Sequence, residues 1–199
     1  MKDSLFERVI TNNFIWNHIQ REYIVPFWSK SLVLPKGFLA LELGCRSGVC
    51  TTILYDYFKP DKLNAFEPNE QYAQRACELV SIEYAGKIMV SPGKFSSILA
   101  PDEQYDVVFD FFNINRSQDW HKSIKEVSRV LKPGGYFAFG EIYDLSIGKY
   151  LSHSLFKKPV GDVFNRKAFV KQLANNKLRL LEENKNLWGH GIIGVAKKS

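Results

Sequence analysis

The residues best suited to chemistry lie between Leu39 and Phe58, in the segment LALELGCRSGVCTTILYDYF. An apolar run reaches Glu42, glycines follow at Gly44 and Gly48, and a helical pattern begins directly afterwards. Glycine lacks a Cβ and tolerates positive φ, so a ligand can approach the backbone closely at such a turn. The first turn of the helix leaves N–H groups free to bind an anionic group. The segment therefore predicts a strand, a turn and a helix that bind a nucleotide-like ligand.

The spacing of the polar residues narrows the ligand to a nucleoside. Glu67 ends the next apolar run, about 25 residues after Glu42, where a carboxylate could accept both hydroxyls of a ribose. A dinucleotide site requires GxGxxG, but the two positions after Gly44 that should hold glycine hold Arg46 and Val49. A phosphate-binding P-loop is excluded because no GK[ST] follows the turn.

Short apolar runs alternate with helical patterns after an N-terminal helical segment, which is typical of an α/β fold. We expect strands at 38–43, 62–67, 87–91, 105–111 and 136–141, and helices at 49–58, 69–80, 118–131 and 166–174. The strands are apolar enough to be buried on both faces of a parallel sheet. Two closing runs, 178–183 and 191–196, are too close for a helical crossover and should pair antiparallel. The predicted fold is a doubly wound, seven-stranded, mostly parallel sheet with a C-terminal antiparallel hairpin.

Four segments, in this order, resemble the class I S-adenosylmethionine-dependent methyltransferases of the small-molecule methylase type. LELGCRSG is similar to their first motif, an acid and glycines at alternate positions, with Arg46 in place of the middle glycine. AFEPNEQYAQRA is similar to their second-strand motif, QYDVVFDFF to the fourth-strand motif, and EVSRVLKPGGYFAFGE to the helix, turn and fifth strand. The resemblance covers roughly residues 39–140. It implies S-adenosylmethionine as the cofactor and S-adenosylhomocysteine as the product.

The resemblance also implies which positions contact the cofactor. Glu42 and the turn should border its methionine part, Glu67 should hold the ribose, and Phe95 could stack on the adenine. Asp110, at the end of the fourth strand, should lie where cofactor and substrate meet. The full set of expected cofactor positions is Glu42, Gly44, Cys45, Arg46, Gly48, Glu67, Pro68, Asn69, Gly93, Lys94, Phe95 and Asp110.

Two of these positions depart from the family pattern. The guanidinium of Arg46 could pair with the cofactor's carboxylate, a contact worth about 1.5–3 kcal/mol, or it could fill the pocket. Lys94 stands at or near the place where the family often has an acid that binds the adenine amine, and a lysine cannot accept that hydrogen bond. A weakened cofactor site is therefore one alternative.

Methyl transfer depends mainly on aligning a nucleophile behind the methyl group, so a general base is optional. The candidates for such a base are Asp110, Glu141, Tyr143 and, if the N-terminal segment closes over the site, His18. The fourth strand ends in DFFN rather than the [DN]PP[YF] of related enzymes that methylate nucleobase or amide nitrogens, which argues against that substrate class. The histidines and cysteines show no metal-binding spacing, so no metal is expected.

These observations predict transfer of a methyl group from S-adenosylmethionine to an oxygen, nitrogen or carbon of a small-molecule acceptor, which could be anionic. One alternative is a non-catalytic binding or scaffold protein that kept the domain. Another is an enzyme acting on RNA or protein, because residues 145–199 contain 11 lysines and arginines but only 3 acids. These basic residues are scattered, as on an ordinary solvated surface, so nucleic acid is the less favoured partner.

Length and composition set the wider frame. No apolar run reaches the roughly 20 residues that cross a bilayer, and the first 13 residues lack the apolar core of a secretory signal. Three cysteines without a CxxC pair favour reduced thiols, so we expect a cytoplasmic protein. Because the first 30 residues are rich in Phe, Trp and Tyr, we expect residues 1–34 to form a helical extension that could act as a lid. Residues 35–199 should form the methyltransferase-like domain.

Overall fold

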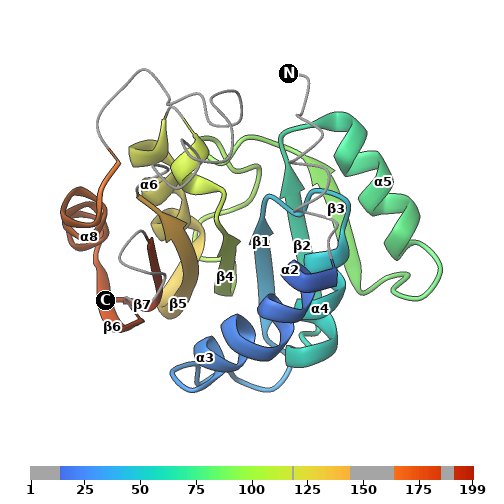
Figure 1. Cartoon of the computed structure of the whole chain (residues 1–199), viewed down its shortest axis with the longest axis horizontal. Coiled ribbons are helices and arrows are strands. Elements are labelled where there is room, and N and C mark those ends of the chain that lie inside the picture. Colours follow the sequence, from blue (N-terminus) through green and yellow to red (C-terminus); the bar gives the residue numbers. More distant parts are fainter. Residues whose placement is uncertain (1–13, 118, 144–163, 185–190) are drawn as a thin grey trace.

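A seven-stranded sheet forms the centre of the computed structural model, which describes residues 14–117, 119–143, 164–184 and 191–199 (Figure 1). The strand order is β3-β2-β1-β4-β5-β7-β6. Strands β1 to β5 pair parallel, and β7 is antiparallel to both β5 and β6, which confirms the predicted fold class. The strands are β1 (Leu39–Leu43), β2 (Lys62–Glu67), β3 (Ile88–Pro92), β4 (Tyr105–Phe111), β5 (Leu131–Ile142), β6 (Leu178–Asn184) and β7 (Gly191–Lys198).

Helices cover both faces of this sheet. Successive side chains of a strand point to opposite faces, so strands that are apolar throughout need both faces covered. One apolar cluster joins Ala40, Val107 and Phe109 to α3 and α4, and the other joins Leu41, Val108 and further strand residues to α6 and α8. The helical elements are α2 (Phe14–Ile19), the π-helical η1 (Gln20–Ile24), α3 (Val25–Ser29), α4 (Val49–Phe58), α5 (Glu70–Val80), the 3₁₀ turn η2 (Ile114–Arg116), α6 (Trp120–Val130) and α8 (Arg166–Asn175).

Most element boundaries follow the sequence prediction, but β5 begins earlier than expected. Leu131 caps α6 with an extended backbone (ψ 138°) and already pairs with Tyr105, so the helix passes directly into the strand. The pairing register shifts before Val107 meets Tyr136, which places the KPGG residues in a bulge. Gly134 adopts φ +76°, a conformation that glycine favours.

The N-terminal helices pack on the same core as the sheet. Trp28 is fully buried, its ring lies 4.7 Å from that of Phe111 and 5.8 Å from that of Phe109, and its indole N–H donates to the carbonyl of Phe139 (3.3 Å). At least α3 is therefore built into the α/β core. Whether the chain divides near residue 34 stays a prediction.

The chain leaves β1 toward β2 on one side and reaches β4 on the other, so the strand order reverses beside β1. In open α/β sheets a crevice forms at the carboxyl ends of the strands at this reversal, and ligands bind there. The carboxyl ends of β1, β2 and β4 carry most of the residues that the sequence singled out. Among the described residues, no helix is both long and apolar enough to cross a membrane.

Candidate functional site

The turn after β1 keeps the backbone of a glycine-rich loop, although its middle position is an arginine. Gly44, Arg46 and Gly48 all have positive φ, at +76°, +50° and +90°. The Gly44 amide donates to the carbonyl of Phe66 (2.7 Å), and the Gly48 amide donates to that of Cys45 (2.9 Å). Non-glycine residues adopt this conformation at an energetic cost, so Arg46 is held there by the surrounding turn.

The two glycines of this turn are required by close packing. A Cβ on Gly44 would lie 2.3 Å from the Asn113 side chain, whose amide donates to the carbonyls of Leu43 (2.9 Å) and Phe111 (3.0 Å). A Cβ on Gly48 would lie 3.1 Å from Ala76, where α4 crosses α5. Asn113 thus joins the ends of β1 and β4 beneath the turn. Sequence analysis did not assign it a role, because Leu43 and Gly44, which it contacts across the sheet, lie about 70 residues earlier in the chain.

Glu67, at the end of β2, is held by two backbone amides. Its carboxylate oxygens accept from the N–H groups of Arg46 and Asn69, each at 2.9 Å. Burial raises the pKa of this carboxyl. Each carboxylate oxygen has a second lone pair, so Glu67 can still accept from ligand hydroxyls. Asn69 itself caps α5, accepting from the amides of Gln71 (3.0 Å) and Tyr72 (3.2 Å).

Glu42 is fully buried below the turn, and neither of its carboxyl oxygens has a hydrogen-bond partner within the described part of the chain. Burial is the main cause that raises its pKa to about 8; the neighbouring Thr51 hydroxyl lowers the pKa, and the carboxyls of Glu67 and Asp110 raise it. Glu42 is therefore mostly uncharged at neutral pH. It is an acceptor that a ligand's ammonium group would satisfy.

Arg46 points its guanidinium into the same region. Its Nε and Nη2 atoms are buried and have no hydrogen-bond partner among the described residues. The guanidinium carbon lies 5.2 Å from the centre of the Tyr72 ring, a cation–π contact. Buried guanidinium donors without partners are costly, which makes this group suited to an anionic ligand.

The adenine-side residues follow β2 and β3. The Gly93 amide donates to the carbonyl of Glu67 (3.1 Å), and a Cβ on Gly93 would lie 3.3 Å from the Phe66 ring. Lys94 and Pro68 are exposed. Phe95 is 9% exposed and belongs to the apolar core between the sheet and α6, so little of its ring is open to a ligand.

Asp110 and Glu141 lie on the α6 face of the sheet, opposite to Glu42, because side chains alternate along β4 and β5. Both carboxyls are fully buried. Asp110 accepts from the amides of Asn113 (3.1 Å) and Ile114 (3.3 Å), and Glu141 accepts from that of Asn115 (3.1 Å). Burial raises the pKa of Asp110 to about 6 and that of Glu141 well above its usual value. The three amide hydrogen bonds to these two carboxyls hold the η2 turn against the sheet.

Of the other two candidate bases, Tyr143 lies close enough to Glu141 for the two groups to interact electrostatically. Tyr143 packs beside Phe164 (ring centres 5.8 Å), and burial raises the pKa of its hydroxyl, which has no hydrogen-bond partner in the described segments. His18 is exposed on α2, where its ring meets that of Tyr23 edge-on (6.3 Å). The described residues include no group of three His, Cys, Asp or Glu side chains placed to hold a metal ion.

These features define a doubly wound α/β protein whose candidate site lies at the carboxyl ends of its parallel strands. Residues 41–139 match the model of a protein family described as "Methyltransferase domain". The chain therefore belongs to the class I S-adenosylmethionine-dependent methyltransferases, which use S-adenosylmethionine as their cofactor.

Comparisons with individual proteins agree with this assignment. The chain is 29% identical over 127 residues to 2-methyl-6-phytyl-1,4-hydroquinone methyltransferase of Synechocystis sp., covering 63% of this chain and 39% of that protein. It is 25% identical over 107 residues to fatty-acid O-methyltransferase of Mycolicibacterium smegmatis, covering 52% of this chain and 37% of that protein. The chain thus spans about two fifths of the length of these curated relatives. A solved S-adenosylmethionine-dependent methyltransferase from Aquifex aeolicus shares the fold, with a TM-score of 0.75, 17% identity and 100% coverage of both chains.

Proposed function

We propose that this chain transfers a methyl group from S-adenosylmethionine to an oxygen, nitrogen or carbon atom of a small-molecule acceptor. One observation carries the proposal: unpartnered polar atoms of Glu42 and Arg46 gather around the glycine turn, next to the ribose candidate Glu67. The charge of Arg46 complements the carboxylate of the cofactor's methionine part, and the carboxyl oxygens of Glu42 can accept hydrogen bonds from its ammonium group. The residues therefore fit the cofactor that the family uses.

Each part of the cofactor has a proposed partner. Arg46 pairs with the carboxylate, Glu42 accepts from the ammonium group, and Glu67 accepts from the ribose hydroxyls. The backbone at Gly44, Cys45 and Gly48 borders the methionine part. Pro68, Asn69, Gly93, Lys94 and Phe95 border the adenine. The exposed positions of Pro68 and Lys94 beside the buried Glu67 support this order along the crevice.

The protein contributes mainly by positioning the reactants. When bound, S-adenosylmethionine supplies an electrophilic methyl group, so an acceptor held in line with it needs little further activation. Asp110 and Glu141 are already engaged with the η2 turn, which favours a supporting role at the crevice over direct proton transfer. Tyr143 and His18 stay candidates for a base that takes a proton from the acceptor.

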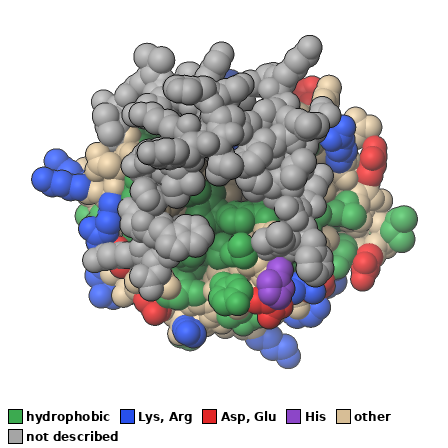
Figure 2. Space-filling model, in the orientation of Figure 1, with side chains coloured by type: hydrophobic (Ala, Val, Ile, Leu, Met, Phe, Trp, Pro, Cys, Tyr) green, Lys and Arg blue, Asp and Glu red, His purple; other side chains and the backbone are tan. Residues whose placement is uncertain are grey.

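The acceptor is proposed to combine an apolar portion with the methylated group. The names of both curated relatives describe acceptors with a hydrocarbon portion, a phytyl hydroquinone and a fatty acid. Hydrophobic side chains gather at the centre of the face drawn in Figure 2, whereas lysines and arginines lie mostly around its rim. The aromatic contact between Trp16 and Phe112 (5.3 Å), just past β4, supplies an apolar wall at the expected meeting point.

The same contact supports a lid function for the N-terminal helical segment. Trp16 belongs to α2 and packs on Phe112, which follows β4 at the crevice. Movement of α2 would uncover this ring. We also propose a cytoplasmic location, because all three cysteines are free thiols, as expected in a reducing compartment.

Cofactor binding tests the proposal directly. Calorimetric titration with S-adenosylhomocysteine should show saturable binding, and the melting temperature should rise with the logarithm of ligand excess. Glu67→Ala should weaken binding about tenfold or more, since it removes a buried acceptor of the ribose. Glu70→Ala is the matched control, because this exposed carboxylate lies three residues away on α5 and should leave binding unchanged. No binding at about 1 mM ligand would reject a functional cofactor site and favour the scaffold alternative.

Turnover is tested with radiolabelled S-adenosylmethionine and a panel of acceptors. Hydroquinones, fatty acids and polar amines cover oxygen, carbon and nitrogen targets. Methylation of an acceptor with a hydrocarbon portion, at oxygen, nitrogen or carbon, is the expected result. Retention on RNA that disappears as salt is raised, together with label transfer to RNA, would instead favour the nucleic-acid alternative.

A further inference from the structure

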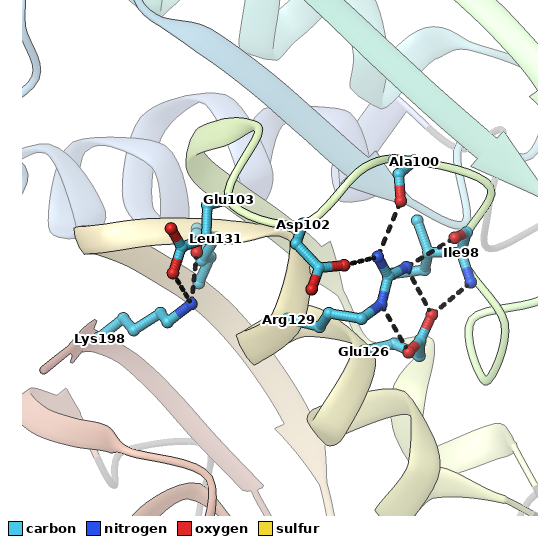
Figure 3. Close-up of polar contacts among 8 residues, drawn as sticks. All are labelled: Ile98, Ala100, Asp102, Glu103, Glu126, Arg129, Leu131 and Lys198. Atoms are coloured by element: carbon cyan, nitrogen blue, oxygen red, sulfur yellow. Dashed lines mark hydrogen bonds and ion pairs between the residues drawn. The ribbon is translucent and has the colours of Figure 1, made fainter.

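The loop between β3 and β4 is tied to α6 by a dense set of polar contacts, shown in Figure 3. Arg129 of α6 donates from Nη2 to the carbonyl of Ile98 and from Nη1 to that of Ala100, each at 2.8 Å. Nη1 also contacts the carboxylate of Asp102 (2.7 Å). A single guanidinium thus holds three consecutive parts of the loop.

Glu126, one helical turn earlier, completes the arrangement. Its carboxylate accepts from Nε and Nη2 of Arg129, both at 2.9 Å, and from the backbone amide of Ile98, also at 2.9 Å. The Glu126 and Arg129 side chains are only 18% and 29% exposed. The hydrogen bonds from Arg129 lower the pKa of Glu126, so the pair stays charged across the neutral range. We call Glu126 and Arg129 the α6 clamp.

The clamped loop is the one that carries the adenine-side residues. Gly93 is fixed at one end by its bond to the carbonyl of Glu67, and Ile98 is fixed at the other by the α6 clamp. Between them, the Ser97 amide donates to the carbonyl of Lys94 (3.1 Å), and Phe95 is buried in the same apolar cluster as Ile98. The position of Lys94 and Phe95 therefore depends on both ends of this short segment.

We propose that Glu126 and Arg129 are positioning residues for the cofactor's adenine, because they fix the loop that holds Gly93, Lys94 and Phe95. This inference rests on the proposed function. The α6 clamp itself contacts the loop backbone, and its effect on the cofactor passes through that loop. The arginine fork is needed because a lysine ammonium is a single point and cannot hold two carbonyls and two carboxylates in these directions.

Ligand affinity is the first readout, measured by calorimetry on Arg129→Lys and Glu126→Gln in the full chain. S-adenosylhomocysteine and 5′-methylthioadenosine are the two probes, since both contain adenosine and only the first has the amino-acid part. Each variant should weaken both ligands by about the same factor, roughly tenfold. In turnover assays the variants should raise the KM for S-adenosylmethionine more than they lower kcat.

A matched control separates positioning from general stability. Lys132 forms an ion pair with Asp106 (2.9 Å) at the amino ends of β5 and β4, and Asp106 is the only hydrogen-bond partner of its ammonium group among the described residues. Lys132→Met should lower the melting temperature by an amount similar to the α6 clamp variants and leave both ligand affinities unchanged. Equal losses of affinity in Lys132→Met would overturn the inference.

Amide hydrogen exchange provides a readout that needs no cofactor. The α6 clamp variants should speed exchange at Gly93, Ser97 and Ile98 by about tenfold or more, while amides of the central strands stay protected. Unchanged exchange at these three amides would overturn the inference, whatever the cofactor results. Faster exchange with unchanged affinity would overturn it too, while leaving the proposed function intact. If the unaltered protein bound neither ligand, the proposed function would fail first, and the inference with it.

Discussion

Arg46 combines two unfavourable features at one position. Its backbone has φ +50°, where glycine is normally found, and two of its guanidinium nitrogens are buried without a partner in the described structure. Each feature alone reduces stability, and an anion bound beside Glu67 would offset the cost of the unpartnered nitrogens. The carboxylate of the cofactor is the anion that the proposed function places there.

Arg46→Gly should therefore weaken S-adenosylhomocysteine binding by about tenfold or more, because it removes a charge-assisted contact. Glycine should also relieve the strained backbone, so the melting temperature should not fall by more than a few degrees. Binding of 5′-methylthioadenosine, which lacks the carboxylate, should stay unchanged in the same calorimetric series. Tighter binding of S-adenosylhomocysteine would show instead that Arg46 obstructs the pocket.

Glu42 is the second residue of the site with an unusual environment, and its protonation state depends on its burial. Its pKa of about 8 in the folded chain compares with about 4.5 when the chain is unfolded. The buried neutral acid is tolerated at low pH, whereas at higher pH the folded chain must either hold a proton or bury a charge. Its contribution to folding stability is thus full below pH 4.5 and is lost as the pH rises toward 8.

The difference in unfolding free energy between Glu42→Gln and the unaltered chain should therefore grow with pH. Glutamine stays neutral, so the variant should gain relative stability between pH 4.5 and 8, by a few kcal/mol at most, and no more above that range. Urea unfolding at several pH values measures this directly. Glu67 and Asp110 titrate in both proteins, so the measured difference contains the titration of Glu42 together with its interaction with these two carboxyls. Parallel stability curves would mean that Glu42 is hydrated or already paired.

At the scale of elements, the glycine turn is shaped by the crossing of α4 and α5. Gly48 precedes the first residue of α4 with φ +90°, and a Cβ added to it would lie only 3.1 Å from the Cα and the Cβ of Ala76. A small residue on each helix lets them approach closely. The contact between α4 and α5 therefore fixes the position of the glycine turn that carries Arg46.

Gly48→Ala should lower the unfolding free energy by about 2–4 kcal/mol, since it combines backbone strain with overpacking against Ala76. Gly37→Ala is the control that separates these two causes. Gly37 has a similar φ of +73°, but nothing lies within 4 Å of an added Cβ. The control should lose only about 1–2 kcal/mol, measured by urea unfolding. Equal losses in both variants would show that α4 can shift away from α5.

The prediction of elements was most accurate where the pattern is local. The limits of β2, β4 and α4 match the expected residues, because glycine, proline or charged residues lie at their ends and interrupt the apolar pattern. The early start of β5 was not foreseen. Leu131 pairs with Tyr105 across the sheet, and that partner lies 26 residues earlier in the chain.

For the whole molecule, the N-terminal helices decide how much of the chain folds as one unit. Trp28 of α3 is fully buried against Phe109 and Phe111 of the central strand β4. Two other residues of the same segment, Ile24 and Val25, are buried to the same degree. This segment therefore contributes to the core as well as to the proposed lid.

Trp28→Ala should destabilise the protein by about 3–5 kcal/mol in urea unfolding, as expected for a large aromatic side chain removed from a packed core. Tyr23→Ala is the matched control, because Tyr23 is 66% exposed and should change stability by no more than about 0.5 kcal/mol. An independent lid would give a different result. In that case, loss of Trp28 would change stability as little as the control.

The sequence by itself determined the fold class, the family and the carboxyl-edge positions of Glu42, Gly44, Gly48 and Glu67. These follow from local periodicity and from motifs of a few residues, whose meaning does not depend on distant partners. Only the tertiary structure decided the states of these groups. Burial makes Glu42 neutral at pH 7, backbone amides from two elements hold Glu67, and the left-handed backbone of Arg46 keeps the glycine geometry of the turn. Asn113 and the α6 clamp act through contacts between residues far apart in the chain, and folding alone brings those residues together.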